Sequence, residues 1–397
     1  MINLKLCAFL CSFLCLIPSV WSKPLKVFIL AGQSNMQGHA HVRTFEHIAM
    51  DPSMASLLSK MTNGSGEHQT LKDVWISCLG SSSSEKIGQL TVGYGAEKNG
   101  PKIGPEFTFG ITMADHLQEP FLIIKTAWGG KSLHTDFRPP SAGPYVFNEQ
   151  QLEGFEKQGK DIEEEKKKRA ELTGHYYRLM VEHVQKVLGD IKRVYPGYDA
   201  KKGYELAGFV WFQGWNDMVD RGVYPKRHEP GGYGEYSKVL AHFIRDVRKE
   251  FSSPEMPFAI GVMGTGGDIA SRPPNRYTPI HLGFREAMTA PSLLPEFKEN
   301  VVAVQTYKCW DFQLDQLKER EGKLKNKERE LKKDKAMTRE KIREEVEKLK
   351  KELYTEKELE ILKKGISNFG FHYHGSGKIM AKIGVAFAEG LLGLAKE

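Results

Sequence analysis

Ser34 and two late histidines, His372 and His374, are residues whose types can perform acyl transfer. A serine hydroxyl becomes a good nucleophile near neutral pH only when a neighbouring base removes its proton, and histidine often supplies that base. The two histidines lie in the stretch Phe371-His-Tyr-His-Gly-Ser, directly before the last predicted helix. Nucleophilic catalysis therefore requires a fold that brings the start of the chain beside its end.

Ser34 follows an apolar run at 27–31 and Gly32. A continuous apolar run predicts a strand buried on both faces of a parallel sheet, and such sheets bind ligands beyond the carboxyl ends of their strands. Gly32 permits a tight exit, and the N–H groups after it begin a helix, where they stabilise negative charge. The alternative is that Ser34 only caps this helix.

Two more predicted strands end in groups that can stabilise an oxyanion. The strand at 121–126 is followed by Trp128 and by two glycines whose N–H groups can form one side of an oxyanion hole. The strand ending at Phe212 is followed by amide side chains, which donate hydrogen bonds while remaining uncharged. Ordinary turns are the alternative at both places. The candidate donors are the Ser34 amide, Gly129, Gly130, Gln213 and Asn216.

Glu106 has two possible roles in the segment Gly104-Pro-Glu. Proline and glutamate suit the first turn of a helix predicted over 104–117. Alternatively, the carboxylate lies at the floor of a cleft and orients the serine loop or a sugar hydroxyl.

Predicted strands and helices alternate along the chain. Strands are predicted at 27–31, 74–78, 121–126, 206–212, 258–262 and 301–305, and helices at 104–117, 176–191, 236–250 and after 376. Such alternation predicts an α/β fold with a parallel, doubly wound sheet. Residues 37–73 are predicted as a loop with short helical pieces, and 79–104 as a loop. His183 lies on an apolar helix stripe and is predicted to be a core residue.

Two charged segments interrupt this alternation. Residues 150–172 are predicted as a helical insertion. In 312–364, leucines recur every seven residues before a break near 335–338, and apolar residues then follow 4-3-4 spacing. This pattern predicts an antiparallel, coiled-coil hairpin with a solvated face. Replacing 314–364 with a short linker is expected to leave turnover of a small ester within about tenfold. Docking of a protein partner, or self-association, is the alternative role.

Composition limits the function. A chain of 397 residues with 40% hydrophobic residues can form one large domain, here expected over 23–397. The net charge of +7 comes without an aromatic-rich basic patch, so nucleic-acid binding is not expected. No Cys-x-x-Cys or His-Glu-x-x-His motif is present, so no metal or cofactor is predicted.

Residues 1–22 have the pattern of a secretory signal peptide, with Lys5, an apolar run at 6–18 and Val-Trp-Ser before the expected cleavage. The apolar run is shorter than the roughly 18 residues of a membrane span. An exported protein, periplasmic or extracellular and without a membrane span once mature, is therefore expected; a retained anchor is the alternative. Cys78 and Cys309 would remain, either paired or as free thiols.

The motifs, taken in chain order, resemble the SGNH hydrolases, specifically the sialate O-acetylesterase-like carbohydrate esterases of family 6. The resemblance implies a three-layer, flavodoxin-like fold and deacetylation of sugars or polysaccharides, through an acetyl-enzyme and without a metal. It assigns Ser34 as nucleophile and a histidine of the last block as base. The motifs are Gly32-Gln33-Ser34-Asn35-Met, Gly104-Pro-Glu106, Trp128-Gly129-Gly130-Lys-Ser, Trp211-Phe-Gln213-Gly214 with Asn216-Asp217, and the final His-Tyr block. The residues expected to line the substrate pocket are Gln33, Asn35, Glu106, Trp128 and Gly214.

One departure concerns the third member of a triad. The family commonly has aspartate three residues before the catalytic histidine, but Phe369 stands there for His372. Glu106, Asp311 or a backbone carbonyl is then expected to orient the imidazole. His372 is favoured over His374 because His-Tyr-x-Gly-Ser matches the family's form, and its pKa is expected near 6.5.

Three functions follow. The leading one is a serine esterase that removes acetyl groups from carbohydrates. The second is a catalytically silent sugar-binding protein, in which tryptophans such as Trp128, Trp211, Trp215 and Trp310 offer stacking surfaces. The third is a scaffold acting through the charged hairpin.

Overall fold

The apolar runs of the sequence form a seven-stranded sheet in the computed structural model, which describes residues 23–82 and 84–395. The strand order is β4-β3-β6-β1-β7-β8-β9, and all neighbours pair in parallel except β4, which is antiparallel to β3. Two short strands form a separate antiparallel pair. The strands are β1 (Leu25–Gly32), β2 (Ala40–His41), β3 (Leu71–Gly80), β4 (Lys86–Leu90), β5 (Lys102–Ile103), β6 (Phe121–Ala127), β7 (Tyr204–Phe212), β8 (Phe258–Val262) and β9 (Val301–Gln305).

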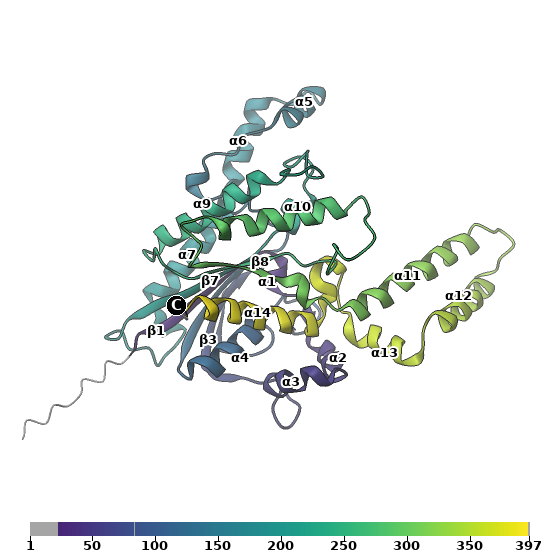
Figure 1. Ribbon diagram of the computed structural model, residues 1–397, viewed down its shortest axis with the longest axis horizontal. Helices are drawn as coiled ribbons and strands as arrows, with labels where there is room; N and C mark the ends of the chain where they lie inside the picture. The colour runs from purple at the N-terminus through teal and green to yellow at the C-terminus, as the bar shows by residue number, and fades with distance from the viewer. Residues whose placement is uncertain (1–22, 83, 396–397) are drawn as a thin grey trace, which may run out of the picture.

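Helices cover both faces of the sheet, which gives three layers (Figure 1). One face packs against α7, α9 and α10, and the other against α4 and α14. The helices are α1 (Ser34–Gln37), α2 (Phe45–Ala49), α3 (Ala55–Met61), α4 (Glu106–Leu117), α5 (Glu149–Lys157), α6 (Ile162–Leu172), α7 (His175–Gly189), α8 (Trp215–Val219), α9 (Gly234–Glu250), α10 (Thr278–Thr289), α11 (Phe312–Leu331), α12 (Arg339–Leu353), α13 (Glu356–Gly365) and α14 (Gly377–Leu394).

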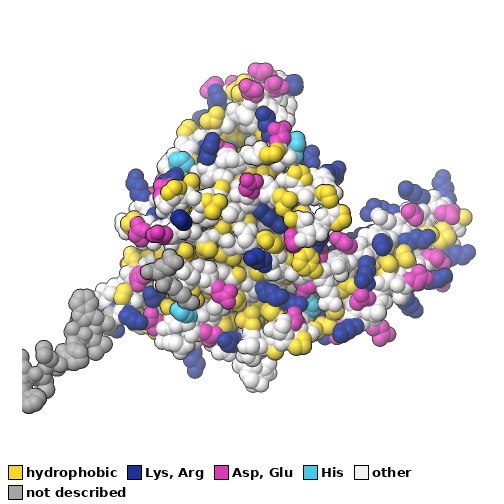
Figure 2. Space-filling model, viewed as in Figure 1, with side chains coloured by type: hydrophobic (Ala, Val, Ile, Leu, Met, Phe, Trp, Pro, Cys, Tyr) yellow, Lys and Arg dark blue, Asp and Glu magenta, His cyan; other side chains and the backbone are white. Residues whose placement is uncertain are grey.

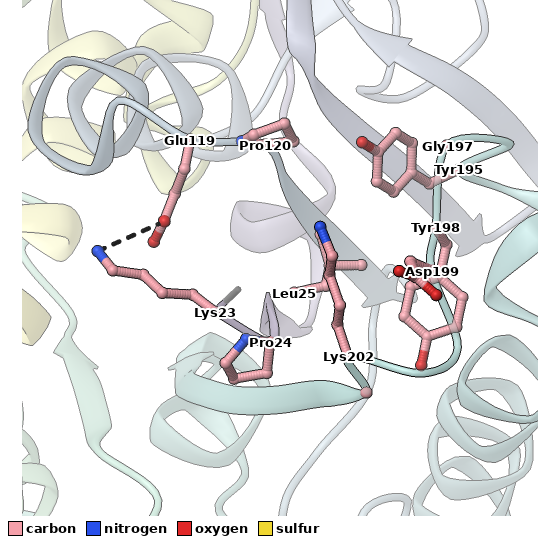
Figure 3. A pocket seen from close by; sticks show the side chains of 11 residues that line it. Lys23, Pro24, Leu25, Glu119, Pro120, Tyr195, Gly197, Tyr198, Asp199 and Lys202 are labelled. Atoms are coloured by element: carbon pink, nitrogen blue, oxygen red, sulfur yellow. Dashed lines mark ion pairs between the residues drawn. The ribbon is translucent and has the colours of Figure 1, made fainter. Parts of the chain in front are cut away.

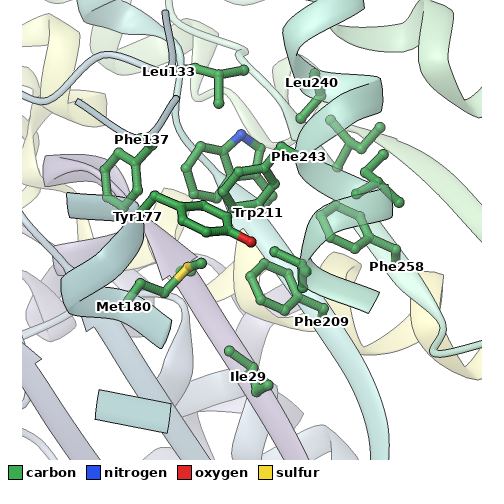
Figure 4. Close-up of a cluster of buried hydrophobic side chains, with 14 of the residues drawn as sticks. Ile29, Leu133, Phe137, Tyr177, Met180, Phe209, Trp211, Leu240, Phe243 and Phe258 are labelled. Carbon is green, nitrogen blue, oxygen red and sulfur yellow. The ribbon is translucent and has the colours of Figure 1, made fainter. Parts of the chain in front are cut away.

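Alternate residues of the central strands face opposite layers, because successive side chains of a strand point to opposite sides. Ile29 belongs to the cluster under α7 and α9, whereas Phe28 packs with the cluster under α4 and α14. Figure 4 shows the first cluster, in which Trp211 of β7 lies against Phe243 of α9 with ring centroids 4.3 Å apart. A strand buried on both faces explains why β1 carries no polar residue between Lys26 and Gly32.

The predicted α/β class with a parallel sheet is confirmed, and each predicted strand lies within a strand of the sheet. The elements that were not predicted include β4 and α10, together with the short β2, β5 and α8. Residues 79–104 contain β4, whose half-exposed sequence Lys-Ile-Gly-Gln-Leu carries too few apolar residues to reveal a strand. Helix α10 also escaped prediction; its amphipathic pattern follows a turn rich in proline and asparagine.

The two charged insertions are helical. Residues 150–172 form α5 and α6, and 312–364 form α11, α12 and most of α13. Helices α11 and α12 lie side by side and project from the sheet layers (Figure 1). Figure 2 shows Lys, Arg, Asp and Glu side chains intermixed over this projection. In the described helix α12 no residue is buried, so its charged side chains form a solvated surface.

The base of the hairpin packs tightly on the domain, unlike its outer part. Leu314 and Leu317 of α11 are at most 1% exposed and pack with Tyr354 and Ile361. Tyr354 donates a hydrogen bond from its hydroxyl to the Leu317 carbonyl at 2.9 Å. The ends of the segment 314–364 contribute a small core of their own, so we expect that only a shorter, outer segment can be replaced.

The predicted signal peptide, residues 1–22, lies outside the described residues. Within 23–82 and 84–395, no helix is long and apolar enough to span a membrane. The alternatives left for the two cysteines are settled, since Cys78 and Cys309 are both free thiols.

Candidate active site

Ser34 lies where β1 ends and α1 begins, at the carboxyl edge of the sheet. Strand β1 lies between β6 and β7. The chain adds β3, β4 and β6 on one side of β1 and then β7, β8 and β9 on the other, so this edge is a topological switch point, where α/β sheets bind ligands. Gly32 is required here because a Cβ would lie 2.1 Å from the Phe212 carbonyl oxygen. Ser34 is 7% exposed, and its hydroxyl makes no hydrogen bond to the described residues.

Glu106 supports the serine loop through an ion pair with Lys125. Its carboxylate accepts hydrogen bonds from the Lys125 ammonium at 2.6 Å and from the Gly104 amide at 2.9 Å. Lys125 also donates to the carbonyl of Gln37, the last residue of α1, at 2.9 Å. Neither charged side chain is exposed. Glu106 is the first residue of α4, as one of its predicted alternatives has it, and through Lys125 it also holds the end of α1. Among the described residues it makes no hydrogen bond to a histidine.

His372 lies in the 3₁₀ segment η7 (Gly370–Gly375), which contacts α1. Its Nδ1 is 3.0 Å from the Asn368 side-chain oxygen, and its Nε2 makes no hydrogen bond to the described residues. Burial lowers the pKa of His372 to about 4, below the value near 6.5 expected from the sequence. The pKa falls because a partly desolvated imidazole has no carboxylate beside it.

The carboxylates expected to orient this imidazole do not reach it. Asp311 instead caps α11 through the Leu314 amide and pairs with Lys378 at 2.9 Å. An asparagine, four residues before His372 in the chain, occupies the orienting position. Asn368 was not predicted from the sequence, because the family pattern places the residue that orients the histidine, an aspartate, at position 369.

His39 was also missed. Its imidazole stacks on that of His372, with ring centroids 3.9 Å apart and planes 1° apart. Burial, followed by the charges of His372, Lys102 and Lys125, lowers the pKa of His39 to about 3. The only sequence signal was its position five residues after Ser34.

His374 is 4% exposed, with its ring centroid 5.0 Å from that of Trp310 and its Nε2 3.7 Å from Asp315 of α11. Its backbone carbonyl accepts hydrogen bonds from the Ser367 and Asn368 amides at 2.8 and 2.9 Å. His374 therefore holds the loop that carries Asn368, and its ring belongs to the base of the hairpin.

The predicted oxyanion donors separate into two groups. Gly129 lies against the nucleophile, since a Cβ placed on it would be 3.9 Å from Ser34 Cβ, and its amide donates to the Ser81 hydroxyl at 3.2 Å. The next residue, Gly130, has φ +75°, a conformation that favours glycine. The Asn216 side chain is half-buried and makes no hydrogen bond to the described residues, so it is free to donate.

Gln213 is committed elsewhere. Its side-chain nitrogen donates to Asp217 at 2.6 Å, to the Lys131 carbonyl at 3.0 Å and to the Gln33 side-chain oxygen at 3.1 Å. Asp217 also accepts from the Leu133 and His134 amides, and burial raises its pKa to about 6. This buried network ties the β1, β6 and β7 loops together, so Gln213 positions the site rather than donating to an oxyanion.

The other predicted pocket residues are mostly buried. Gln33 accepts from the Gly214 amide at 3.3 Å, and Asn35 is 4% exposed. Trp128 packs on Tyr176 with centroids 5.3 Å apart, and Trp211 and Trp310 are also buried, so none of these three offers a stacking surface. That expectation was wrong for these three, because their side chains pack in the two cores beside the sheet.

One other aromatic ring, that of Phe371, lies next to His372, and two more pack against Phe371. Trp215 is half-buried with its centroid 5.5 Å from Phe371, and Phe371 lies 4.4 Å from the His372 ring. Phe369 stacks on Phe371 at 5.3 Å and is 70% exposed. We call Trp215, Phe369 and Phe371 the aromatic platform.

A groove of about 420 Å³ adjoins the site and is lined by residues that include Gln37, His39, Ser81, Lys98 and Asn368. A second pocket of similar volume lies at the opposite, amino edge of the sheet, among Lys23, Glu119, Tyr195 and Tyr198 (Figure 3). It shares no residue with the strand-end loops that carry the predicted chemistry. The groove at the end of α1, the helix that begins with Ser34, is therefore the candidate substrate site.

The predicted core histidine was interpreted correctly. His183 is buried, and its Nε2 lies 3.0 Å from the Ser77 hydroxyl. Among the described residues, no group of three His, Cys, Asp or Glu side chains is placed to hold a metal ion.

Comparison with known proteins agrees with the motifs. The sequence matches the family described as carbohydrate esterase, sialic acid-specific acetylesterase, over residues 24–282. The chain belongs to this family of carbohydrate esterases. The match includes Ser34 and the β6 and β7 loops and stops before His372.

Among solved structures, the chain is similar to a protein of Arabidopsis thaliana, with 16% identity, a TM-score of 0.39, and coverage of 71% of this chain and 86% of that one. It is also similar to a carbohydrate acetylesterase from Xanthomonas citri, with 13% identity, a TM-score of 0.39, and coverage of 70% of this chain and half of that one. No curated protein matches the sequence.

Proposed function

We propose that this carbohydrate esterase is an exported serine O-acetylesterase, in which Ser34 attacks the acetyl carbonyl and His372 is the general base. The observation that carries the mechanism is the hydrogen bond between His372 Nδ1 and Asn368, in a segment that contacts the helix beginning at Ser34. This bond leaves Nε2 as the free nitrogen. Export is proposed from the signal-peptide pattern of residues 1–22.

The reaction proceeds in two steps. Proton transfer from the Ser34 hydroxyl to His372 Nε2 accompanies attack on the acetyl carbonyl, and the protonated imidazole then gives this proton to the leaving sugar oxygen. Water hydrolyses the acetyl-enzyme by the same proton transfers in reverse order. The amides of Ser34 and Gly129 and the side chain of Asn216 are the proposed oxyanion donors, with Ser81 giving up its bond to Gly129 when substrate binds.

The aromatic platform supports a carbohydrate as the group that carries the acetyl ester. Phe369 is 70% exposed and stacks on Phe371 beside His372, and flat aromatic faces bind the apolar C–H face of a sugar. The platform takes the place of the buried tryptophans first expected to stack.

Acetate release from acetylated xylan and from p-nitrophenyl acetate tests the proposal. The wild-type protein is expected to hydrolyse both, and Phe369→Ala to raise KM for the xylan about tenfold while leaving the small ester unaffected. Val146→Ala, which removes an equally exposed apolar side chain elsewhere, is the control. Release from neither substrate would favour a silent sugar-binding protein.

A further inference from the structure

The Asn368 side chain lies between two imidazoles. Its oxygen is 3.0 Å from Nδ1 of His372, and its nitrogen is 3.5 Å from Nδ1 of His39. The two rings are stacked on one another. One amide therefore contacts the base and the ring on which the base rests.

The backbone determines which end of this amide is the oxygen. The Phe369 N–H donates to the Asn368 side-chain oxygen at 2.7 Å, and a backbone N–H cannot accept. The atom facing His372 is therefore an acceptor, so His372 Nδ1 carries the proton and Nε2 carries the lone pair. This is the tautomer that a general base requires at Nε2.

The other end of the amide faces His39. The Asn368 nitrogen can only donate, so His39 Nδ1 accepts and that ring is neutral. Because the two rings stack at 3.9 Å, a positive charge on either His39 or His372 disfavours protonation of the other. The Lys102 and Lys125 cations further lower the pKa of His39. The titratable side chain that packs on His372 is His39 itself.

The loop beneath the amide is held from several sides. The His374 carbonyl accepts from the Ser367 and Asn368 amides, and the adjacent Tyr373 donates or accepts through its buried hydroxyl with Gly264 and Thr306, each at 2.8 Å. Tyr373 and His374 have φ of +52° and +59°, a left-handed conformation that costs free energy in residues other than glycine. The fold thus maintains a strained backbone that keeps Asn368 in place.

We propose that Asn368 is the positioning residue for the general base, doing with a neutral amide what a carboxylate does in a triad, and that His39 is the flat surface on which His372 is held. The inference rests on the proposed function, because it concerns the base of that reaction. It also explains how the site works without aspartate at residue 369. The amide orients the ring without stabilising its protonated form.

Asn368→Asp separates orientation from charge. An aspartate keeps an acceptor for both Phe369 and His372 but places a negative charge 3.0 Å from Nδ1. The acid limb of the kcat/KM profile is expected to move from about pH 4 upward by about 1–3 units. The control is Asn275→Asp, which adds the same charge in an exposed turn where the side-chain oxygen accepts from Tyr277. A limb that stays in place, as in the control, would overturn the proposal.

Asn368→Ala tests orientation itself. Loss of the acceptor is expected to lower kcat about 100-fold with KM nearly unchanged. Asn368→Asp is expected to have a kcat close to that of the wild type at pH values above the acid limb of its own profile. Equal kcat in wild type and Asn368→Ala, with both folded by circular dichroism, would contradict a positioning role.

Imidazole nitrogen NMR on the Ser34→Ala variant gives a readout that needs no turnover. A protonated Nδ1 on His372, and its loss in the Ser34→Ala/Asn368→Ala double variant, are expected. A protonated Nε2 instead would refute the positioning role whatever the activity. If Ser34→Ala itself remains fully active, the proposed function fails while the tautomer measurement still decides the inference.

Discussion

The Lys125 ammonium lies 2.6 Å from the Glu106 carboxylate with neither side chain exposed, and it also binds the Gln37 carbonyl at the end of the nucleophile's helix. A buried ion pair of this kind is costly to break from one side, because the remaining charge is left desolvated. The pair therefore couples the position of α1 to the stability of the whole domain.

Glu106→Gln is expected to lower the free energy of unfolding by about 3–5 kcal/mol, since the Lys125 charge loses its partner. Denaturant unfolding measures this. Lys60→Met is the matched control, because its pair with Asp115 is about half exposed and should contribute no more than about 1 kcal/mol. Equal losses in the two variants would show that Glu106 is not the support described.

Replacing the outer hairpin, residues 321–350, with a short Gly/Ser linker is expected to leave turnover of a small ester within about tenfold. Arg320 Nη1 donates to the Leu353 carbonyl at 2.9 Å, so the two cut ends are already close and the loop-closure cost is small. The control deletes 314–364, which also removes the buried Leu314 and Leu317 and the Asp315 contact to His374. Loss of folding in the short deletion would mean that the solvated part also packs on the domain.

Much of the fold could be predicted from the sequence because runs such as 27–31 and 206–212 carry only residues suited to a doubly buried strand. The position of Ser34 followed, since parallel strands place their carboxyl ends at one edge. Helix-spaced leucines similarly indicated the hairpin. These signals are local, because the run or spacing of apolar residues is visible in consecutive positions of the sequence.

The site's contacts were less predictable because they join distant residues. Nothing near Asn368 indicates that residue 39 stacks beside it, and an amide was not sought where families place a carboxylate. The directions of the Trp128 and Gln213 side chains could not be predicted for a related reason. A side chain at the end of a strand can turn toward solvent or into the core, and its contacts with neighbouring loops determine which.

His372→Ala is expected to abolish acetate release, because it removes the imidazole whose Nδ1 is held by the Asn368 oxygen and whose Nε2 is the proposed proton acceptor. His374→Ala is expected to lower the free energy of unfolding by about 2–4 kcal/mol, owing to the cavity left beside Trp310, while kcat falls no more than about tenfold. Kinetics and denaturant unfolding of both variants, side by side, check this. A dead but stable His374→Ala would reverse the assignment of the base.

The free energy of unfolding is expected to fall as the pH drops from about 6.5 towards 4. Burial lowers the pKa of His134 to about 3 and of His183 and His281 to about 4, below the unfolded value of about 6.5. The unfolded chain therefore binds more protons in this range, so stability is full above pH 6.5 and declines below it, by up to about 1.4 kcal/mol per pH unit for each group.

Urea unfolding at several pH values measures the slope. His183→Gln keeps a hydrogen-bonding partner for Ser77 and should reduce the slope, whereas His228→Gln, at an exposed residue, should not. A stability that stays level down to pH 4 would show that these imidazoles are solvated.

The most direct test of the account is the rate of acetate release by the Ser34→Ala variant. Because a nucleophile and its base act as a unit, the variant is expected to lose roughly 10⁴–10⁶-fold in kcat on both p-nitrophenyl acetate and acetylated xylan, with an unchanged circular dichroism spectrum. Mass spectrometry of the wild type mixed with the small ester should then find the acetyl group on Ser34. Activity retained in a folded Ser34→Ala variant would contradict the central claim.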